Sequence, residues 1–475
     1  MIKLNSTVRY LFINLALIST AFSTADKTSK AASAKVSPKE KTSNQQPQKN
    51  ITPIDIQEEV LENGLRIVVI NTKCKGAVVF GVLYFVGSAD DPRSSIGVSH
   101  FTEHLMFGGT KNLGSMELKE LLGRYNANTN AFTNNDVTCY THYCRKEFLD
   151  INLKIEADRM QNLLLDEDYI NREREVIIEE RKTRLESDPR QKFMVEAAYK
   201  IMYLYSTYSY PVIGYVDQIL RCDKATLLTH YNKFYKPNNA VIVLVGDIKL
   251  KEAVNLVRKY FGGIQKKDDV KRKRVIDPKQ SELGLTYTIE HESEQTSMHD
   301  LDTIYNIDRN LINTIKKVII VEIIQNILAG GEDSILSQNM VDKKELVYVI
   351  GSYVDIKAYD KGRFSISTIM REGKNVKTVD AALTELINNF PNLLTPELFE
   401  RAKAKMLDCI EMMEDDPEDV MQWCVTNLGN RYRISDIRNV KKILQEITFE
   451  EVKQMARTIF TKKNRIMQIY THPNT

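Results

Sequence analysis

The sequence predicts an α+β fold made of two related halves joined by a linker. Three observations indicate this class. Strand-like and helical patterns alternate from about residue 56 onward, and their order is similar before and after residues 266–283. Each half has about 200 residues, which is a usual domain size. Apolar residues make up 43% and charged residues 27% of the 475 residues, which is an ordinary globular composition.

The first residues have the pattern of a signal peptide. In residues 1–25, two basic residues precede an uncharged, mostly apolar run, and the small residues Ser23 and Ala25 suit a cleavage site. We therefore expect an exported protein, periplasmic or secreted. A mitochondrial presequence is the alternative, because no acidic residue precedes Asp26. Residues 26–55 hold few apolar side chains and predict a flexible tether.

The pattern of the first half, residues 56–265, begins with a hairpin. Asn63-Gly64 lies between two strand-like runs in residues 60–70, and Asn-Gly is typical of hairpin turns. A long buried strand follows at 77–88. Further along, helices are expected at 95–107, 116–125, 147–165, 167–187 and 250–260, and a strand at 240–248.

The linker, residues 266–283, contains a run of positive charges from Lys271 to Arg274. We interpret this run as a solvated segment, which is what most charge runs are. The second half, residues 284–475, again alternates strands and helices. Its strands are expected at 346–354 and 363–370, and its helices at 311–329, 376–389, 396–414, 416–428 and 448–459.

Composition excludes several classes of protein. The 66 Lys+Arg balance 63 Asp+Glu to a net charge of +3, which argues against a dedicated nucleic-acid-binding protein. The six cysteines are too sparse for a disulfide scaffold and include no C-x-x-C pair, so Cys139 and Cys144 are expected as buried apolar residues. Beyond the N-terminus, no segment has the roughly 18 apolar residues of a membrane span.

One short motif predicts a metal site. His100 and His104 lie four residues apart in a predicted helix, so both imidazoles share one helix face, and Glu103 lies beside them. Two neutral imidazoles suit Zn²⁺, and a third protein ligand plus water completes a catalytic site. A nearby carboxylate can take a proton from water and pass it to a leaving amine. This order, H-x-x-E-H, is typical of inverzincins.

The third protein ligand must come from another part of the chain. Glu173 and Glu180 are seven residues apart and share a face of the helix predicted at 167–187. One of these carboxylates can face the metal while the other supports the site from behind. Glu175 and Glu179 lie in the same segment, so spacing alone does not choose among them.

Taken together, these segments resemble the pitrilysin-type inverzincin metallopeptidases, which include insulin-degrading enzyme and mitochondrial processing peptidase. The resemblance covers roughly residues 56–470. Its blocks lie at 97–110, 126–140, 173–189, 210–215 and 234–248. It implies two α+β domains that close like a clamshell over a chamber, and one Zn²⁺ per chain. Such a chamber admits unfolded peptides and excludes folded proteins.

The resemblance also implies roles for particular residues. His100, His104 and Glu180 match the metal ligands, and Glu103 matches the base that activates water. Glu173 matches an acidic position that supports the site. These matches choose Glu180 as the third ligand where spacing alone did not.

Peptide binding is implied at two places. Asn130, Ala131 and Phe132 match an edge strand to which an extended peptide adds as a further strand. Family members often carry an Arg and a Tyr seven residues apart that grip the substrate. Tyr348 stands at the Tyr position, but Val341 stands where the Arg is expected.

We therefore expect a zinc metalloendopeptidase of short or unfolded peptides that forms a homodimer or a heterodimer with a related subunit. Two alternatives stay open. The first is a non-catalytic structural subunit, and the second is a catalytic subunit that is active only with a partner that supplies the gripping Arg. The complete metal motif favours an enzyme.

Overall fold

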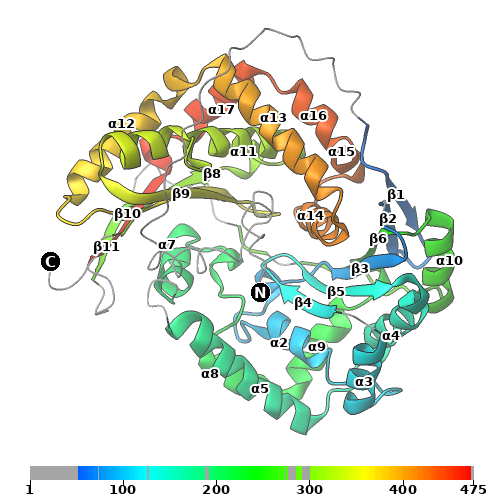
Figure 1. Ribbon diagram of the computed structural model, residues 1–475. Helices are drawn as coiled ribbons and strands as arrows, with labels where there is room; N and C mark the ends of the chain where they lie inside the picture. Colours follow the sequence, from blue (N-terminus) through cyan, green and yellow to red (C-terminus); the bar gives the residue numbers. More distant parts are fainter. Residues whose placement is uncertain are drawn as a thin grey trace, which may run out of the picture.

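A computed structural model of the chain shows two α+β halves, each built on one β-sheet (Figure 1). It describes residues 52–72, 74–125, 128–187, 192–272, 274–276, 285–290 and 300–471. The expected signal peptide, most of the expected tether and residues 277–283 of the expected linker lie outside this description. Within these ranges, no helix has the length and apolar character needed to cross a membrane. The predicted α+β class is confirmed.

The first sheet has the strand order β1-β2-β6-β3-β5-β4. The pair β2 and β6 is parallel, and all other neighbours are antiparallel. The predicted hairpin joins β1 to β2. Its Gly64 has φ +84°, which favours glycine, and a Cβ there would lie 2.8 Å from Cβ of Asn238. The strands are β1 Ile56–Val60, β2 Arg66–Asn71, β3 Ala77–Tyr84, β4 Asn128–Thr133, β5 Thr138–Arg145 and β6 Ala240–Gly246.

The second sheet, β7-β11-β8-β10-β9, repeats the topology of β2 to β6. With β1 left aside, β2 pairs in parallel with β6 as β7 does with β11, and the antiparallel order β3-β5-β4 corresponds to β8-β10-β9. This repetition confirms that the halves are related. The corresponding strands β4 and β9 each form an edge of their sheet. The strands are β7 Leu285–Glu290, β8 Asp300–Ile307, β9 Val347–Asp355, β10 Gly362–Met370 and β11 Arg465–Thr471.

Helices of the first half cover one face of the first sheet. Alternate residues of β3 point to opposite faces, so Phe80 and Val82 pack with these helices while Val79 and Leu83 face the second half. Burial on both faces explains the continuous apolar run of this strand. The helices are α2 Val98–Leu105, α3 Ser115–Tyr125, α4 Leu149–Asn162, α5 Glu167–Arg181, α7 Tyr199–Met202, α8 Val216–Arg221, α9 Lys224–Phe234 and α10 Leu250–Phe261.

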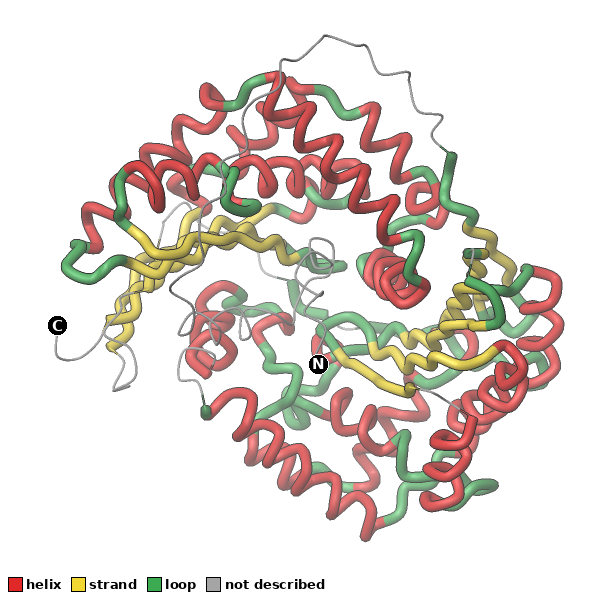
Figure 2. Tube along the Cα trace, viewed as in Figure 1, coloured by secondary structure: helices red, strands yellow, loops and turns green. Residues whose placement is uncertain are grey.

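One helix of the second half, α14, packs on the other face of the first sheet, against β3 and β6 (Figure 2). Met421 on this helix lies close to Gly81 of β3. The two halves therefore share one continuous apolar core. The helices are α11 Ile315–Ala329, α12 Val376–Leu393, α13 Pro396–Met413, α14 Pro417–Gly429, α15 Ile434–Arg438, α16 Val440–Glu446 and α17 Phe449–Ile459.

The interpretation of the charge run in the linker as solvated is wrong for two of its residues. The side chain of Arg274 is 5% exposed and donates hydrogen bonds to Asp90 and Asp136 of the first half. Arg272 is half-buried and also contacts Asp90. Lys271 follows the prediction and is exposed, and Lys273 lies outside the described residues. The sequence of the run did not indicate that these arginines are buried, because their acidic partners lie 138 or more residues away in the chain.

Both cysteines singled out from the sequence are buried and free, as predicted. Cys139 and Cys144 lie on β5, and burial raises the pKa of each thiol. They serve as small apolar residues between the strands and their covering layers.

Candidate metal centre

The helix that carries the H-x-x-E-H motif, α2, is anchored at its N-terminus. Gly97 precedes it with φ +99°, and a Cβ here would lie 2.7 Å from Cα of Gly214. The Asp91 carboxylate accepts hydrogen bonds from the Gly97 N–H (2.7 Å), the Ser99 N–H (3.2 Å) and the Ser99 hydroxyl (2.6 Å). It satisfies amide groups that a helix leaves free. Sequence reasoning missed Asp91, although an Asp before a predicted helix signals a cap.

The three motif residues lie on one face of α2. His100 and Glu103 are buried, at 6% and 8% exposure, and His104 is half-buried. The two imidazole rings are 4.8 Å apart between centroids and stand at 67° to each other. One turn of helix therefore presents two nitrogen ligands and one carboxylate to the same side.

Glu180, near the end of α5, completes this group. Its Oε2 atom lies 3.7 Å from His100 Nε2 and 3.3 Å from His104 Nε2. One ligand atom from each of these residues lies within 4.8 Å of the others. Buried Glu180 Oε2, which faces both imidazoles, has no hydrogen-bond partner among the described residues. An unpaired carboxylate oxygen beside two imidazole nitrogens fits a bound cation, and this set suits zinc.

Glu173 lies one layer further out. Its Oε2 is 3.1 Å from His104 Nδ1, on the side of the ring away from Glu180. A carboxylate there keeps the proton on Nδ1 and leaves the Nε2 lone pair for a metal. The other two candidates of this segment do not join the group. Glu175 is exposed, and Glu179 pairs with Lys182 at the surface.

The second oxygen of Glu180 is held by Arg184. This residue lies in the π-helical turn Lys182–Glu186 that follows α5, and its Nη2 is 2.7 Å from Glu180 Oε1. The ion pair leaves Oε2 facing the imidazoles. Sequence reasoning missed Arg184, although a basic residue four positions after a glutamate on a helix is a signal for such a pair.

The electrostatics suit a cation at this point. Burial lowers the pKa of His100 to about 3, so its imidazole is neutral. Burial works to raise the pKa of Glu180, but His104 and His100 lower it below its ordinary value. Burial also works to lower the pKa of His104, yet the Glu173 and Glu180 carboxylates raise it to about 9. Burial raises the pKa of Glu103, and a hydrogen bond from Thr133 opposes this rise.

Comparison with known proteins decides the family. Residues 66–214 match the family described as Insulinase (Peptidase family M16), and residues 221–406 match the Peptidase M16 inactive domain. The chain belongs to the M16 peptidase family. The resemblance to the pitrilysin-type inverzincins is thereby confirmed.

Curated M16 relatives carry protease names. The chain is 28% identical over 289 residues to the zinc protease PqqE of Helicobacter pylori, a match that spans 60% of this chain and 64% of that one. It is 25% identical over 415 residues to the uncharacterized zinc protease YmxG of Bacillus subtilis, spanning 86% and 96%. The matched region thus covers less than two thirds of the first relative and nearly all of the second.

Solved M16 structures show the same fold. A protease from Helicobacter pylori superposes with a TM-score of 0.79 at 21% identity, covering 88% of this chain and all of that chain. The periplasmic protease PqqL from Escherichia coli superposes with a TM-score of 0.76 at 18% identity, covering 89% of this chain and 48% of that chain. At these identities the likeness concerns the fold alone.

The helix α2, which carries the H-x-x-E-H motif, packs against β4, a strand at the edge of the first sheet. It carries Asn130, Ala131 and Phe132, the residues matched to the peptide-binding edge. Ala131 packs towards the core that contains α2, and Phe132 packs towards the opposite core. At the end of the strand, the Thr133 hydroxyl donates a 2.5 Å hydrogen bond to Glu103 Oε2. Sequence reasoning missed this contact.

Tyr348 lies on β9, the outermost strand of the second sheet, and is 45% exposed. The Arg371 guanidinium lies 5.2 Å from the centre of its ring. Val341, at the position where family members often have Arg, lies in the turn Ser337–Lys343 and packs against the apolar core that the two halves share. Among the described residues, no hydrogen bond or ion pair links Tyr348 to the metal-ligand group.

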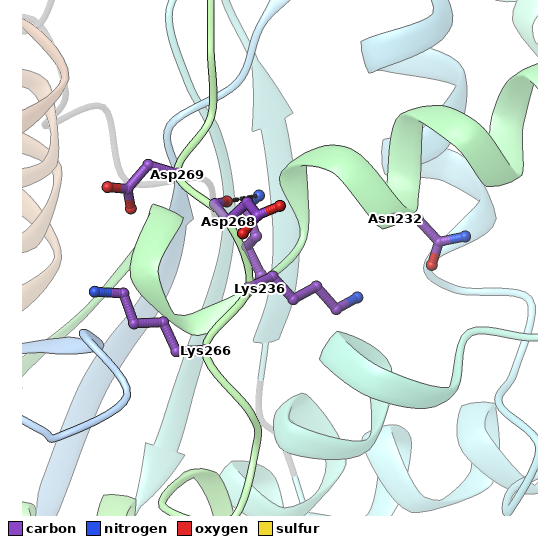
Figure 3. A pocket seen from close by; sticks show the side chains of 6 residues that line it. Asn232, Lys236, Lys266, Asp268 and Asp269 are labelled. Atoms are coloured by element: carbon purple, nitrogen blue, oxygen red, sulfur yellow. Dashed lines mark hydrogen bonds between the residues drawn. The ribbon is translucent and has the colours of Figure 1, made fainter.

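A surface pocket lies apart from this group. It is lined by Asn232, Lys236 and residues 266–269, at the C-terminal part of α9 and the segment after α10 (Figure 3). Lys236 Nζ donates a hydrogen bond of 2.6 Å to the carbonyl oxygen of Asp268. None of its lining residues belongs to the metal-ligand group.

Proposed function

We propose that this chain is a zinc metalloendopeptidase that hydrolyses short or unfolded peptides. The observation that carries the proposal is the convergence of His100, His104 and Glu180 on one point, with Glu103 on the same face of α2. Two imidazoles and one carboxylate are a ligand set of catalytic zinc, which keeps a position for water. The family and the protease names of its relatives support this conclusion.

Each residue of the group has a role in the proposed reaction. When bound, zinc supplies Lewis-acid activation of a water and of a peptide carbonyl. His100, His104 and Glu180 would hold the metal, and Glu173 would orient the His104 ring. Glu103 would accept a proton from the attacking water and deliver it to the leaving amine.

The free edge of β4 would align the substrate. Strand addition uses the backbone groups of the peptide, which every sequence has but which a folded protein has already paired. Asn130, Ala131 and Phe132 would therefore bind an extended segment with modest sequence preference. This role supports short or unfolded peptides as the substrate class.

The second half would close the chamber without a metal of its own. The helix α11 follows β8, as α2 follows the corresponding strand β3, but α11 contains no histidine. This asymmetry supports one Zn²⁺ per chain. We propose residues 56–265 as the catalytic domain and 284–475 as the closing domain, joined by 266–283.

The sequence also supports a location and an assembly for the proposed enzyme. The pattern of residues 1–25 supports export to the periplasm or secretion, with a mitochondrial location as the alternative. Val341 leaves the second half without a guanidinium at the usual gripping position, which supports a heterodimer with a related subunit that carries one. The second candidate function is therefore a catalytic subunit that needs this partner. A homodimer is the other assembly that we propose, and its second copy has the same valine.

The test is cleavage of a quenched, unstructured peptide by the purified protein, with zinc content measured on the same samples. We expect activity and one zinc per chain, loss of activity with zinc retained in Glu103→Gln, and loss of both in Glu180→Gln. Glu179→Gln is the matched control, because Glu179 is exposed on the same helix. It should leave zinc and activity unchanged.

The possible results separate the candidates. One zinc without activity, followed by activity on adding a related subunit, would favour the partner-dependent enzyme. One zinc and no activity with any partner would favour a non-catalytic subunit. Absence of zinc from the wild-type protein would refute the assignment of the site.

A further inference from the structure

Among the described side chains, one donates a hydrogen bond to the carboxylate of Glu103, and this donor is Thr133. Thr133 Oγ1 lies 2.5 Å from Glu103 Oε2 and comes from a strand 30 residues further along the chain. Glu103 is 8% exposed, so few water molecules compete for this carboxylate. A hydroxyl in such a place restricts the rotamer of the carboxylate.

The neighbouring hydroxyls leave the Thr133 proton for Glu103. Thr138 pairs with Thr133 across β4 and β5, and their hydroxyl oxygens are 3.2 Å apart. The proton of Thr138, however, is donated to the carbonyl oxygen of Val86 at 2.9 Å. A hydroxyl has one proton to donate, so Thr138 does not also donate to Thr133. The Thr133 proton goes to Glu103, because the carboxylate is closer, at 2.5 Å, than the Thr138 oxygen, at 3.2 Å, and is the stronger acceptor.

Strand geometry connects this hydroxyl to the peptide-binding edge. Thr129, Ala131 and Thr133 share one face of β4 because side chains alternate along a strand, and Ala131 packs towards the core that contains α2. β4 contacts α2 along this face (Figure 1). The outer edge of the same strand is the surface to which the proposed function docks the peptide. The same strand, β4, would thus set the position of the bound peptide and also supplies the Thr133 hydroxyl that contacts Glu103.

We propose that Thr133 is a positioning residue that fixes the Glu103 carboxylate relative to a peptide aligned on β4. The proposal rests on the function proposed above and adds a residue to it. Thr133 does not touch the reacting atoms. It acts through Glu103, and its loss should slow the proton transfer while leaving peptide binding and metal binding intact.

The kinetic test compares three variants. Thr133→Val keeps the branched shape and removes the hydroxyl, and Thr133→Ser keeps the hydroxyl. Thr129→Val is the matched control, because its hydroxyl lies on the same face of β4 but faces His142 Nδ1 at 3.4 Å. We expect Thr133→Val to lower kcat about 10- to 100-fold with KM within about twofold. Zinc content should be unchanged, and Thr133→Ser and Thr129→Val should stay within about threefold of wild type.

A structural readout keeps this proposal separate from the proposed function. Crystal structures of the wild type, Thr133→Val and Thr133→Ser should show one Glu103 conformer in the first and last, and a displaced or divided carboxylate in Thr133→Val. An unchanged Glu103 in Thr133→Val would overturn the positioning role even if the wild-type protein cleaves no peptide. In an active enzyme, a rise in KM with unchanged kcat, or equal losses in the Val and Ser variants, would also overturn it.

Discussion

Arg274 should be a strong determinant of stability, although it lies in a segment whose sequence reads as a solvated linker. Its guanidinium donates to both oxygens of Asp90, at 2.7 and 3.1 Å, and to Asp136, and it stacks 4.4 Å from the centre of the Tyr359 ring. The side chains of Asp90 and Asp136 are 2% and 8% exposed. Arg274→Met would therefore leave two buried carboxylates with less compensation.

The structure sets the size of the effect. Breaking a buried ion pair by removing one partner costs about 3–5 kcal/mol. Asp90 retains Arg272, 3.4 Å away, and Asp136 retains the Tyr208 hydroxyl at 2.6 Å. These remaining partners place the expected loss near the lower end, about 3 kcal/mol. Lys271→Met in the same charge run should cost less than about 0.5 kcal/mol, because its side chain is exposed.

Urea unfolding followed by the fluorescence of Trp423, the only tryptophan of the chain, measures both variants. Trp423 is buried on α14, which packs between the halves, so its signal reports the shared core. Adding Asp136→Asn to Arg274→Met should recover part of the loss, because it removes one of the stranded charges. A loss for Arg274→Met no larger than that for Lys271→Met would refute the reasoning.

Three further results are expected. Glu173→Gln should weaken zinc binding about 10- to 100-fold by loosening His104, while Glu175→Gln should not, as measured by chelator competition. Asp91→Ala removes the oxygens that accept hydrogen bonds from the start of α2, and should lower the free energy of unfolding by about 1–2 kcal/mol; an unchanged urea midpoint would contradict the cap. Burial lowers the pKa of His230 to about 3, so this histidine stabilises the fold above its unfolded pKa of about 6.5 and loses that contribution as pH falls; between pH 7 and 5 the loss is about 2 kcal/mol, and His230→Asn should flatten the dependence.

Local patterns in the sequence predicted the secondary structure closely. The helix expected at 396–414 is α13, Pro396–Met413, and the strand expected at 240–248 is β6, Ala240–Gly246. Bounds were less accurate where a turn depends on distant residues. The helix expected at 95–107 begins at Val98, because Gly97 turns against Gly214.

The H-x-x-E-H motif could be read from the sequence because its geometry is local. Residues four apart on a helix share a face in any tertiary setting, so the common face of His100, Glu103 and His104 follows from spacing. The choice among the acids of α5 does not follow in the same way. Only the packing of α5 against α2 turns Glu180 towards both imidazoles and Glu173 towards the back of one of them.

By itself, the sequence thus determined the elements, their order and the metal motif, and it suggested that the halves are related, which the strand order confirmed. The tertiary structure decided which distant side chains meet: Thr133 with Glu103, Asp91 with the start of α2, and Arg274 with two acids of the first half. The physical reason is the distance along the chain over which each interaction acts. Helical and strand periods are properties of neighbouring residues, whereas a hydrogen bond or ion pair across the fold depends on how whole elements pack, which no spacing in the chain encodes.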